Sequence, residues 1–276
     1  MNLRAKADLA DPPGLVGPPS LRVQSVLYNN DAQGIDRFLS SIAQAVRFAR
    51  GKVDVGHVHL ALGDCSSLPR LQEASLGGLE EALAEAGIAS FSYEHFHANL
   101  GSAAGHNRLI ESFDSDLLLI INPDVVASPY VISELLLPLS DKLVGAVEAR
   151  QIPVEHPKPY DSITGTTPWA TTACALFRRE VVEKVGRFDA ESFFLYCDDV
   201  DYSWRIRLAG YRIVFHPAAI IFHDKRLDSA GRMVVSDAEE FYSADAGLLM
   251  AYKYSREDLL ALFINHFDVH GTPLQR

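Results

Sequence analysis

One segment indicates the fold class of this chain most clearly: Leu117-Leu118-Leu119-Ile120-Ile121-Asn122-Pro123-Asp124-Val125. Residues 117–121 are apolar without alternation, which is typical of a strand buried on both faces, and the run is too short for an ordinary buried helix. Asn-Pro-Asp is good turn chemistry, so the strand is expected to end there. Open α/β sheets bind ligands at the carboxyl ends of their strands. The sequence therefore places Asp124 at a candidate functional position.

Strand and helix patterns alternate on both sides of this central strand. The alternation predicts an α/β domain with a mostly parallel central sheet flanked by helices. The expected strands are 21–28, 53–62, 88–93, 143–147, 172–177, 212–215 and 218–222, and the expected helices are 35–49, 71–86, 102–113, 129–139, 179–185 and 200–209.

The chain of 276 residues has the length of one catalytic domain with terminal extensions. Residues 1–20 are rich in Pro and Gly and lack apolar periodicity, which predicts a flexible leader. One domain is expected over residues 21–230. Residues 231–276 are expected to form a helical extension, with amphipathic helices at 238–254 and 257–267.

Composition excludes several classes of protein. The chain has 25 basic and 36 acidic residues and a net charge of -11, which disfavours nucleic acid as a partner. Its three cysteines fit neither a disulfide framework nor a structural zinc site. No stretch approaches the roughly 20 apolar residues that cross a bilayer. We expect a cytoplasmic protein, and a peripheral contact with the inner face of the cell membrane stays open.

Two groups of acidic residues could carry chemistry. Asp124 could hold a divalent cation that neutralises a phosphate leaving group, although a simple turn would use the same residue. Asp198, Asp199 and Asp201 lie at the start of a predicted helix, where carboxylates also serve as caps. The aromatic run 193–196 just before them would bury a carboxylate, and burial raises the pKa toward that of a general base.

Two further segments are compatible with binding. His223 follows an apolar strand and enters a polar stretch, where a neutral imidazole could complete a manganese or magnesium site. The segment 99–108 opens a helix with Gly101 and Gly105. Those glycines would allow close approach of a phosphate, but close helix packing explains small residues equally well.

Together these segments resemble family 2 glycosyltransferases of the GT-A fold, especially the bacterial rhamnosyl- and galactofuranosyltransferase-like branch. The resemblance covers roughly residues 21–224 and rests on the order of the motifs as well as their content. The motifs are Val26-Leu27-Tyr28-Asn29-Asn30, Gly63-Asp64-Cys65-Ser66, the Asn99 to Asn107 loop, Asn122-Pro123-Asp124, Phe193 to Asp201, and His223.

The resemblance implies a role for each candidate residue. Asp199 would be the general base that deprotonates the acceptor hydroxyl, and Asp124 and His223 would bind Mn²⁺ or Mg²⁺. Asp64 would accept a hydrogen bond from the ring N–H of the nucleotide base. The implied donor-binding residues are Tyr28, Asn30, Asp64, Gly101, Asn107, Asn122 and Asp124, and the implied acceptor-binding residues are Trp169, Tyr196 and Asp198.

By the same resemblance the chain is an inverting, metal-dependent glycosyltransferase that uses a nucleotide-diphosphate sugar. The favoured donor is dTDP-L-rhamnose, with UDP-galactofuranose or another UDP-hexose as the alternative. The implied acceptor is a growing cell-surface polysaccharide or a lipid-linked glycan. A nucleotidyltransferase is disfavoured because residues 26–33 contain no Lys or Arg. A non-catalytic homologue that binds a sugar nucleotide or a partner protein is the remaining alternative.

Overall fold

The computed structural model describes residues 17–53, 55–225, 229 and 234–275. Its strands are β1 (Leu21–Leu27), β2 (Val58–Asp64), β3 (Ser90–His95), β4 (Leu117–Ile121), β5 (Val125–Ala127), β6 (Val144–Ile152), β7 (Thr166–Thr167), β8 (Cys174–Arg178) and β9 (Arg212–His223). Its helices are α1 (Ala32–Lys52), α2 (Glu73–Glu85), α3 (Gly101–Ile110), α4 (Val131–Leu136), the short 3₁₀ helix η1 (Leu137–Ser140), α5 (Arg179–Val185), α6 (Asp198–Leu208), α7 (Asp237–Lys253) and α8 (Glu257–His270).

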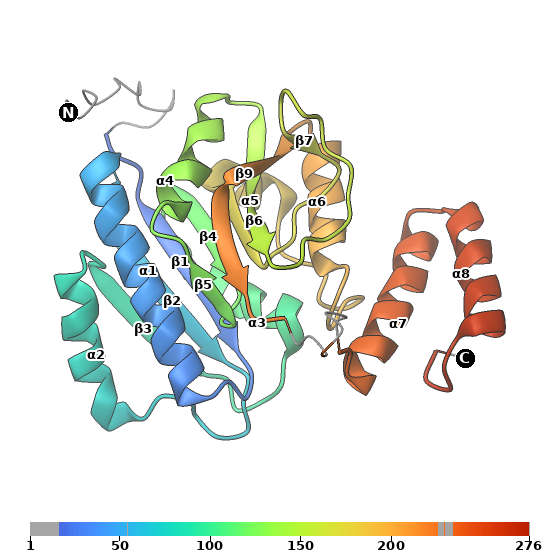
Figure 1. The fold of residues 1–276 in the computed structure, drawn as a ribbon, viewed down its shortest axis with the longest axis horizontal. Helices are drawn as coiled ribbons and strands as arrows, with labels where there is room; N and C mark the ends of the chain where they lie inside the picture. Colours follow the sequence, from blue (N-terminus) through green and yellow to red (C-terminus); the bar gives the residue numbers. More distant parts are fainter. Residues whose placement is uncertain (1–16, 54, 226–228, 230–233, 276) are drawn as a thin grey trace.

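The strands form one twisted sheet in the order β3-β2-β1-β4-β8-β6-β9-β5, with β7 paired to β9 (Figure 1). Strands β3, β2, β1 and β4 run parallel to one another. All five residues of β4 are buried, as the unbroken apolar run predicts. The carboxyl ends of β1 and β4 therefore lie at the same edge of the sheet, and the loops that follow them can meet.

The second half of the sheet contains antiparallel pairs that the sequence did not predict. Strand β8 pairs antiparallel with both β4 and β6, and the short strands β5 and β7 pair antiparallel with β9. Strand β9 is continuous, although two separate strands were expected. Its register against β6 slips around Pro217, because proline cannot donate a ladder hydrogen bond there.

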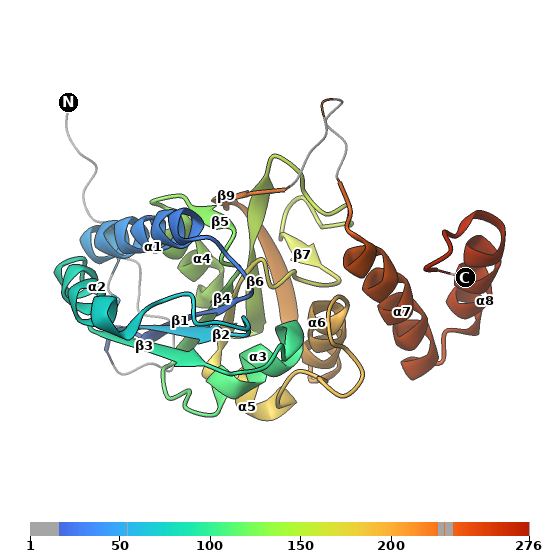
Figure 2. The ribbon, with the colours of Figure 1, turned by 90° about the horizontal axis from the view of Figure 1, so that it is seen from below.

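Helices cover both faces of the sheet (Figures 1 and 2). One layer contains α1, α2 and α4, whose apolar residues share a core cluster with strand residues such as Leu119 and Ile121. The opposite layer contains α3, α5 and α6, and its cluster includes Phe177 and Tyr202. The prediction of an α/β domain with a mostly parallel sheet flanked by helices is confirmed.

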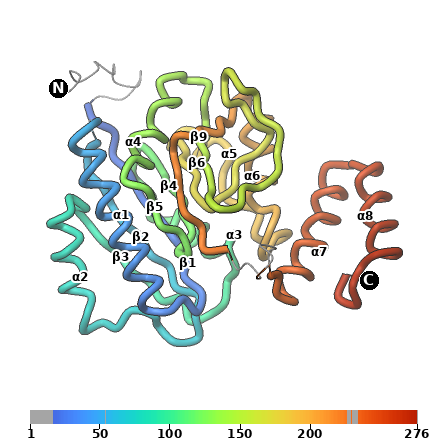
Figure 3. The backbone as a smooth tube through the Cα atoms, viewed as in Figure 1, coloured from blue at the N-terminus to red at the C-terminus, as the bar shows by residue number. Residues whose placement is uncertain are grey.

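The helices α7 and α8 lie together at one end of the sheet, and α7 is the one nearer to α6 (Figures 1 and 3). The expected leader falls mainly on residues 1–16, which lie outside the described residues. Ser20, which the leader was expected to include, already binds Asp116 through its backbone N–H and its hydroxyl. Among the described residues, no helix combines the length and the hydropathy needed to cross a bilayer.

Candidate active site

A cavity of about 660 Å³ opens at the carboxyl edge of β1 and β4. Its walls come from the loop after β1, the turn after β4, the start of β5 and the ends of β6 and β9. The lining residues are Tyr28, Asn29, Asn30, Asp31, Gly34, Arg37, Pro123, Asp124, Val125, Val126, Ile152, Pro153, Phe222, His223 and Asp224. The cavity therefore joins four of the predicted site residues, which lie far apart in the sequence.

Asp124 and His223 face each other in this cavity. Strand pairing places Val125 opposite His223, and Nε2 of the imidazole lies 3.2 Å from Oδ2 of Asp124. On the other side of the ring, Nδ1 lies 2.7 Å from Oε1 of Gln151. Because an amide oxygen only accepts hydrogen bonds, Nδ1 must carry a proton. Nε2 then faces the Asp124 carboxylate, and a neutral ring would offer its lone pair on that side.

Gln151 is itself fixed in this orientation. Its backbone N–H donates to Oε2 of Glu155 at 2.9 Å, and its side-chain amide donates to Oε1 of the same residue at 3.5 Å. This arrangement of imidazole, amide and carboxylate is the kind of outer shell that orients a histidine ligand. Gln151 and Glu155 are not among the residues predicted from the sequence, and only their position near the end of an apolar strand hints at a role.

The donor set fits a divalent cation in part. An imidazole nitrogen and a carboxylate oxygen are both ligands of Mn²⁺, and their facing lone pairs would be stabilised by a cation between them. Among the described residues there is no group of three or more His, Cys, Asp or Glu side chains that could hold a metal ion. A cation at this position would therefore need further ligands from water or from a bound ligand.

The predicted donor-binding residues divide into two groups. Tyr28 and Asn30 line the cavity, as expected. Asp64 is fully buried and accepts hydrogen bonds from the Arg70 backbone N–H at 2.7 Å and the Tyr93 hydroxyl at 2.5 Å. Burial opposes ionisation, but these hydrogen bonds and those from Ser66 outweigh it and lower the pKa of Asp64. Its contact with a nucleotide base stays a prediction.

Asn122, Gly101 and Asn107 do not line the cavity. Gly101 has a φ of +74°, and a Cβ atom there would lie 2.3 Å from the carbonyl oxygen of Phe194, so only glycine fits. Asn107 uses both ends of its amide to bind the backbone of Phe188, at 2.9 and 2.8 Å. The structure thus gives Gly101 and Asn107 packing roles, and their contact with a donor stays a prediction.

The first turn of α6 carries the predicted base. Tyr196 and Cys197 precede it with φ angles of 69° and 56°. Such left-handed conformations cost about 1–2 kcal/mol for each non-glycine residue. They produce a sharp turn directly before the carboxylates of Asp198 and Asp199. Strained backbone of this kind persists only where neighbouring contacts hold it.

Asp198 and Asp199 have different surroundings. Asp198 is buried, and its Oδ2 atom has no hydrogen-bond partner among the described residues. Asp199 is half-buried, and one of its oxygens accepts from the Val200 backbone N–H at 2.8 Å. Burial raises the pKa of both carboxyl groups, and repulsion from Asp199 raises that of Asp198 further. A raised pKa suits a group that must accept a proton.

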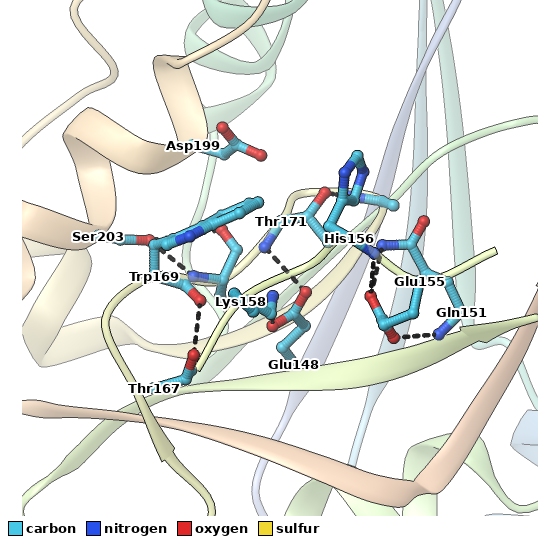
Figure 4. A network of polar contacts seen from close by, with 12 residues as sticks. Glu148, Gln151, Glu155, His156, Lys158, Thr167, Trp169, Thr171, Asp199 and Ser203 are labelled. Carbon is cyan, nitrogen blue, oxygen red and sulfur yellow. Dashed lines mark hydrogen bonds and ion pairs between the residues drawn. The ribbon is translucent and has the colours of Figure 1, made fainter. Parts of the chain in front are cut away.

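A buried ion pair lies beside this turn (Figure 4). Lys158 donates to Glu148, and neither side chain is more than 2% exposed. The ammonium group lies 4.3 Å from the centre of the Trp169 ring, and Glu148 also accepts from the Thr171 backbone N–H at 3.1 Å. Burial is the main cause that raises the pKa of Glu148 to about 7, against the opposing effect of Lys158. The positive charge of Lys158 acts on Asp199 as well and offsets part of the rise in its pKa that burial causes.

Sequence reasoning missed this pair. A carboxylate within an apolar strand is a signal, because burying a charge requires a partner. The partner could not be identified from the sequence, since Lys158 lies in the irregular segment between β6 and β7. Trp169 lies just beyond β7, and its contact with an acceptor sugar stays a prediction.

Solved structures of similar architecture identify the fold of this domain. A mannosyltransferase from Pyrobaculum calidifontis, in complex with GDP-Man and Mn²⁺, superposes with a TM-score of 0.62 at 16% identity over 97% of this chain and 74% of that one. GalNAc-T7 with UDP, GalNAc and Mn²⁺ gives 0.61 at 14% identity over 89% of this chain and 52% of that one. S. aureus TarS with UDP-GlcNAc gives 0.55 at 14% identity, covering 90% and 73%. The domain has the GT-A glycosyltransferase fold.

The sequence comparisons find similarity to one family of glycosyltransferases. Residues 158–235 match the family model described as "Glycosyltransferase like family 2". The N-acetylglucosaminyl-diphospho-decaprenol L-rhamnosyltransferases of two Mycobacterium tuberculosis strains are each 41% identical over 64 residues, which is 23% of this chain and 20% of theirs. The match thus spans one fifth of those relatives. The resemblance to family 2 glycosyltransferases is confirmed.

Proposed function

We propose that this protein is a metal-dependent, inverting glycosyltransferase that moves a sugar from a nucleotide-diphosphate donor to a hydroxyl group. One observation carries the proposal. The carboxylate of Asp124 and Nε2 of His223 face each other at 3.2 Å in a cavity at the carboxyl edge of the sheet. Two further features support it, namely the family match over residues 158–235 and the GT-A fold.

The cavity would hold the donor. Tyr28 and Asn30 would contact the nucleotide, and Asp124 and His223 would hold Mn²⁺ or Mg²⁺ beside its diphosphate. A divalent cation there would neutralise the negative charge that grows on the leaving diphosphate. Gln151 keeps the proton of His223 on Nδ1 and so leaves Nε2 available. The Mn²⁺ in the complexes of the similar mannosyltransferase and of GalNAc-T7 agrees with this assignment.

Asp199 would act as the general base. It would take the proton of the acceptor hydroxyl while the oxygen attacks C1 of the donor sugar, and the diphosphate would leave from the opposite face. One displacement of this kind inverts the configuration at C1. Asp198 and Trp169 would contact the acceptor. Tyr196 is proposed for the same surface.

For the donor we propose dTDP-L-rhamnose, with a UDP-hexose or UDP-galactofuranose as the alternative. For the acceptor we propose a lipid-linked glycan or a growing cell-surface polysaccharide. The 41% identity to a rhamnosyltransferase that acts on a diphospho-decaprenol glycan supports both choices. Such an acceptor would place the protein in the cytoplasm, at the inner face of the membrane.

A transfer assay tests the proposal. The protein would be incubated with Mn²⁺, a polyprenyl-diphosphate N-acetylglucosamine acceptor and either dTDP-L-rhamnose or a UDP-hexose, and release of the nucleotide diphosphate would be followed. We expect release that depends on both acceptor and metal. The anomeric configuration of the product, read by NMR, should be opposite to that of the donor. Retention would contradict inversion, and no release with any donor would favour a non-catalytic homologue.

A further inference from the structure

The end of α7 contacts the first turn of α6, the turn that carries Asp199. The ammonium group of Lys253 lies 2.6 Å from Oδ1 of Asp201 and 2.7 Å from Oδ2 of Asp189. The hydroxyl of Tyr254 donates to the same Oδ1 of Asp201 at 2.8 Å. Because the side chain of Asp201 is fully buried, this carboxylate depends on these partners to offset the cost of its burial.

Asp201 is also tied within its own helix. Nε of Arg205 donates to its Oδ2 atom at 2.9 Å. Both oxygens of Asp201 therefore accept hydrogen bonds, one from α6 itself and one from the end of α7. Because its side chain is also fully buried, Asp201 is not available to a substrate. It anchors the turn two residues beyond Asp199.

Apolar contacts extend the same interface. Phe193 is buried and clusters with Ala246 and Met250 of α7. The rings of Phe194 and Tyr242 lie 4.9 Å apart. These contacts hold the segment before α6 from the side of α7. The polar and the apolar contacts thus enclose the left-handed turn at residues 196 and 197 from both ends.

That turn needs support from outside α6. Tyr196 and Cys197 adopt conformations that disfavour ordinary residues, and the Cys197 side chain makes no capping hydrogen bond to α6. A strained turn relaxes unless the surrounding contacts over-determine it. The backbone N–H of Asp201 donates to the Cys197 carbonyl at 2.8 Å, and this bond begins the regular hydrogen bonding of α6. Lys253 and Tyr254 bind the side chain of the same Asp201, so they hold the start of the helix.

We propose that Lys253 and Tyr254 are positioning residues for Asp199, and that the end of α7 therefore contributes to the active site. This inference rests on the proposed function, in which Asp199 is the base. The two side chains do not touch the substrate. They hold the first turn of α6 so that the Asp199 carboxylate keeps its direction toward the acceptor hydroxyl.

Three variants test the proposal in the full-length protein. Lys253→Met removes the charge, Tyr254→Phe removes only the hydroxyl, and Lys253→Arg restores a cation. We expect kcat of Lys253→Met to fall roughly 10- to 100-fold, since small displacements of a reacting group have effects of that order. Affinity for the nucleotide diphosphate should stay within about twofold, and Lys253→Arg should recover most of kcat. A smaller fall is expected for Tyr254→Phe. The matched control is Arg256→Met, whose guanidinium binds Asp258 on the same helical hairpin.

Hydrogen exchange provides a readout that does not depend on activity. In Lys253→Met and Tyr254→Phe, the amides of residues 198–203 should exchange faster than in the wild type, while β4 keeps its protection. Unchanged exchange in both variants would overturn the inference, and so would an unchanged kcat in an active protein. Equal losses of kcat and nucleotide affinity would also overturn it, because they indicate general destabilisation. Absence of transfer in the wild type would refute the proposed function instead.

Discussion

Nε2 of His223 lies 3.2 Å from Oδ2 of Asp124, and the antiparallel pairing of β5 with β9 holds the two residues in this position. Neither residue is close to the other in sequence, and the pairing involves a three-residue strand. Gln151 binds the other ring nitrogen, Nδ1, and so fixes the orientation of the His223 ring. The contact thus joins the turn after the central strand to the end of the last strand.

Replacing Asp124 should weaken nucleotide diphosphate binding in the presence of Mn²⁺ but not in its absence. Asp124→Asn removes an anionic ligand, and we expect the affinity for a nucleotide diphosphate in the presence of Mn²⁺ to fall roughly 10- to 100-fold or more. Affinity without metal should change little. Asp268→Asn on the exposed helix α8 is the matched control. Calorimetry measures both affinities, and unchanged manganese dependence would rule out this role for Asp124.

Gln151 gives a second test of the same site without removing a ligand. Gln151→Leu leaves Nδ1 of His223 without its acceptor, so the ring loses its fixed orientation. We expect Mn²⁺ affinity to fall about 10- to 100-fold, as is usual for outer-shell partners of a histidine ligand. Gln44→Leu, on the exposed side of α1, is the control. Electron paramagnetic resonance of bound Mn²⁺ reads the affinity directly, and equal affinities of the two variants would contradict the assignment.

Asp199→Asn should abolish transfer but preserve donor binding. A positioned general base contributes about 10²- to 10⁴-fold to the rate, and the amide cannot take the proton. We therefore expect kcat to fall by this factor, with the affinity for the nucleotide diphosphate unchanged. Steady-state kinetics with calorimetry measures both quantities. A variant with near-normal kcat would show that another group is the base.

The pH dependence of kcat should report the raised pKa of Asp199. The base works only when ionised, so kcat rises with pH through this pKa. Because burial raises the pKa of Asp199, the acid limb should lie above the ordinary carboxyl value of about 4. A limb at or below about pH 4 would contradict this assignment.

The buried pair of Lys158 and Glu148 should matter for stability. Lys158→Met leaves Glu148 buried without its cation, which typically costs about 3–5 kcal/mol of unfolding free energy. The double variant Lys158→Met/Glu148→Leu should recover most of that loss. Lys142→Met, at an exposed position, is the control. Urea unfolding measures all four proteins, and a loss below about 1 kcal/mol in the single variant would refute the prediction.

The parallel half of the fold could be predicted from the sequence. Strand β4 and helix α5 have the predicted bounds, because an unbroken apolar run and a clear amphipathic period are local signals. The three-residue strand β5 could not be predicted. It is a strand only because β9 returns beside it, and such pairing depends on residues about 100 positions away.

The site residues that could be predicted from the sequence are those that form a recognisable local motif at the end of a strand. Tyr28, Asn30 and Asp124 follow strand ends, His223 is the last residue of β9, and all four meet in one cavity. The partners that fix their orientation, such as Gln151, were not predictable, because an amide in a strand has no local pattern. The role of Lys253 was also hidden, since its contacts with Asp189 and Asp201 form only after α7 packs on α6.

The decisive experiment is calorimetric binding of dTDP and of UDP, each with and without Mn²⁺. We expect binding that requires Mn²⁺, prefers one of the two bases and is lost in Asp124→Asn. No binding of either nucleotide, or binding that ignores the metal, would contradict the assignment of Asp124 and His223 as the metal-dependent donor site.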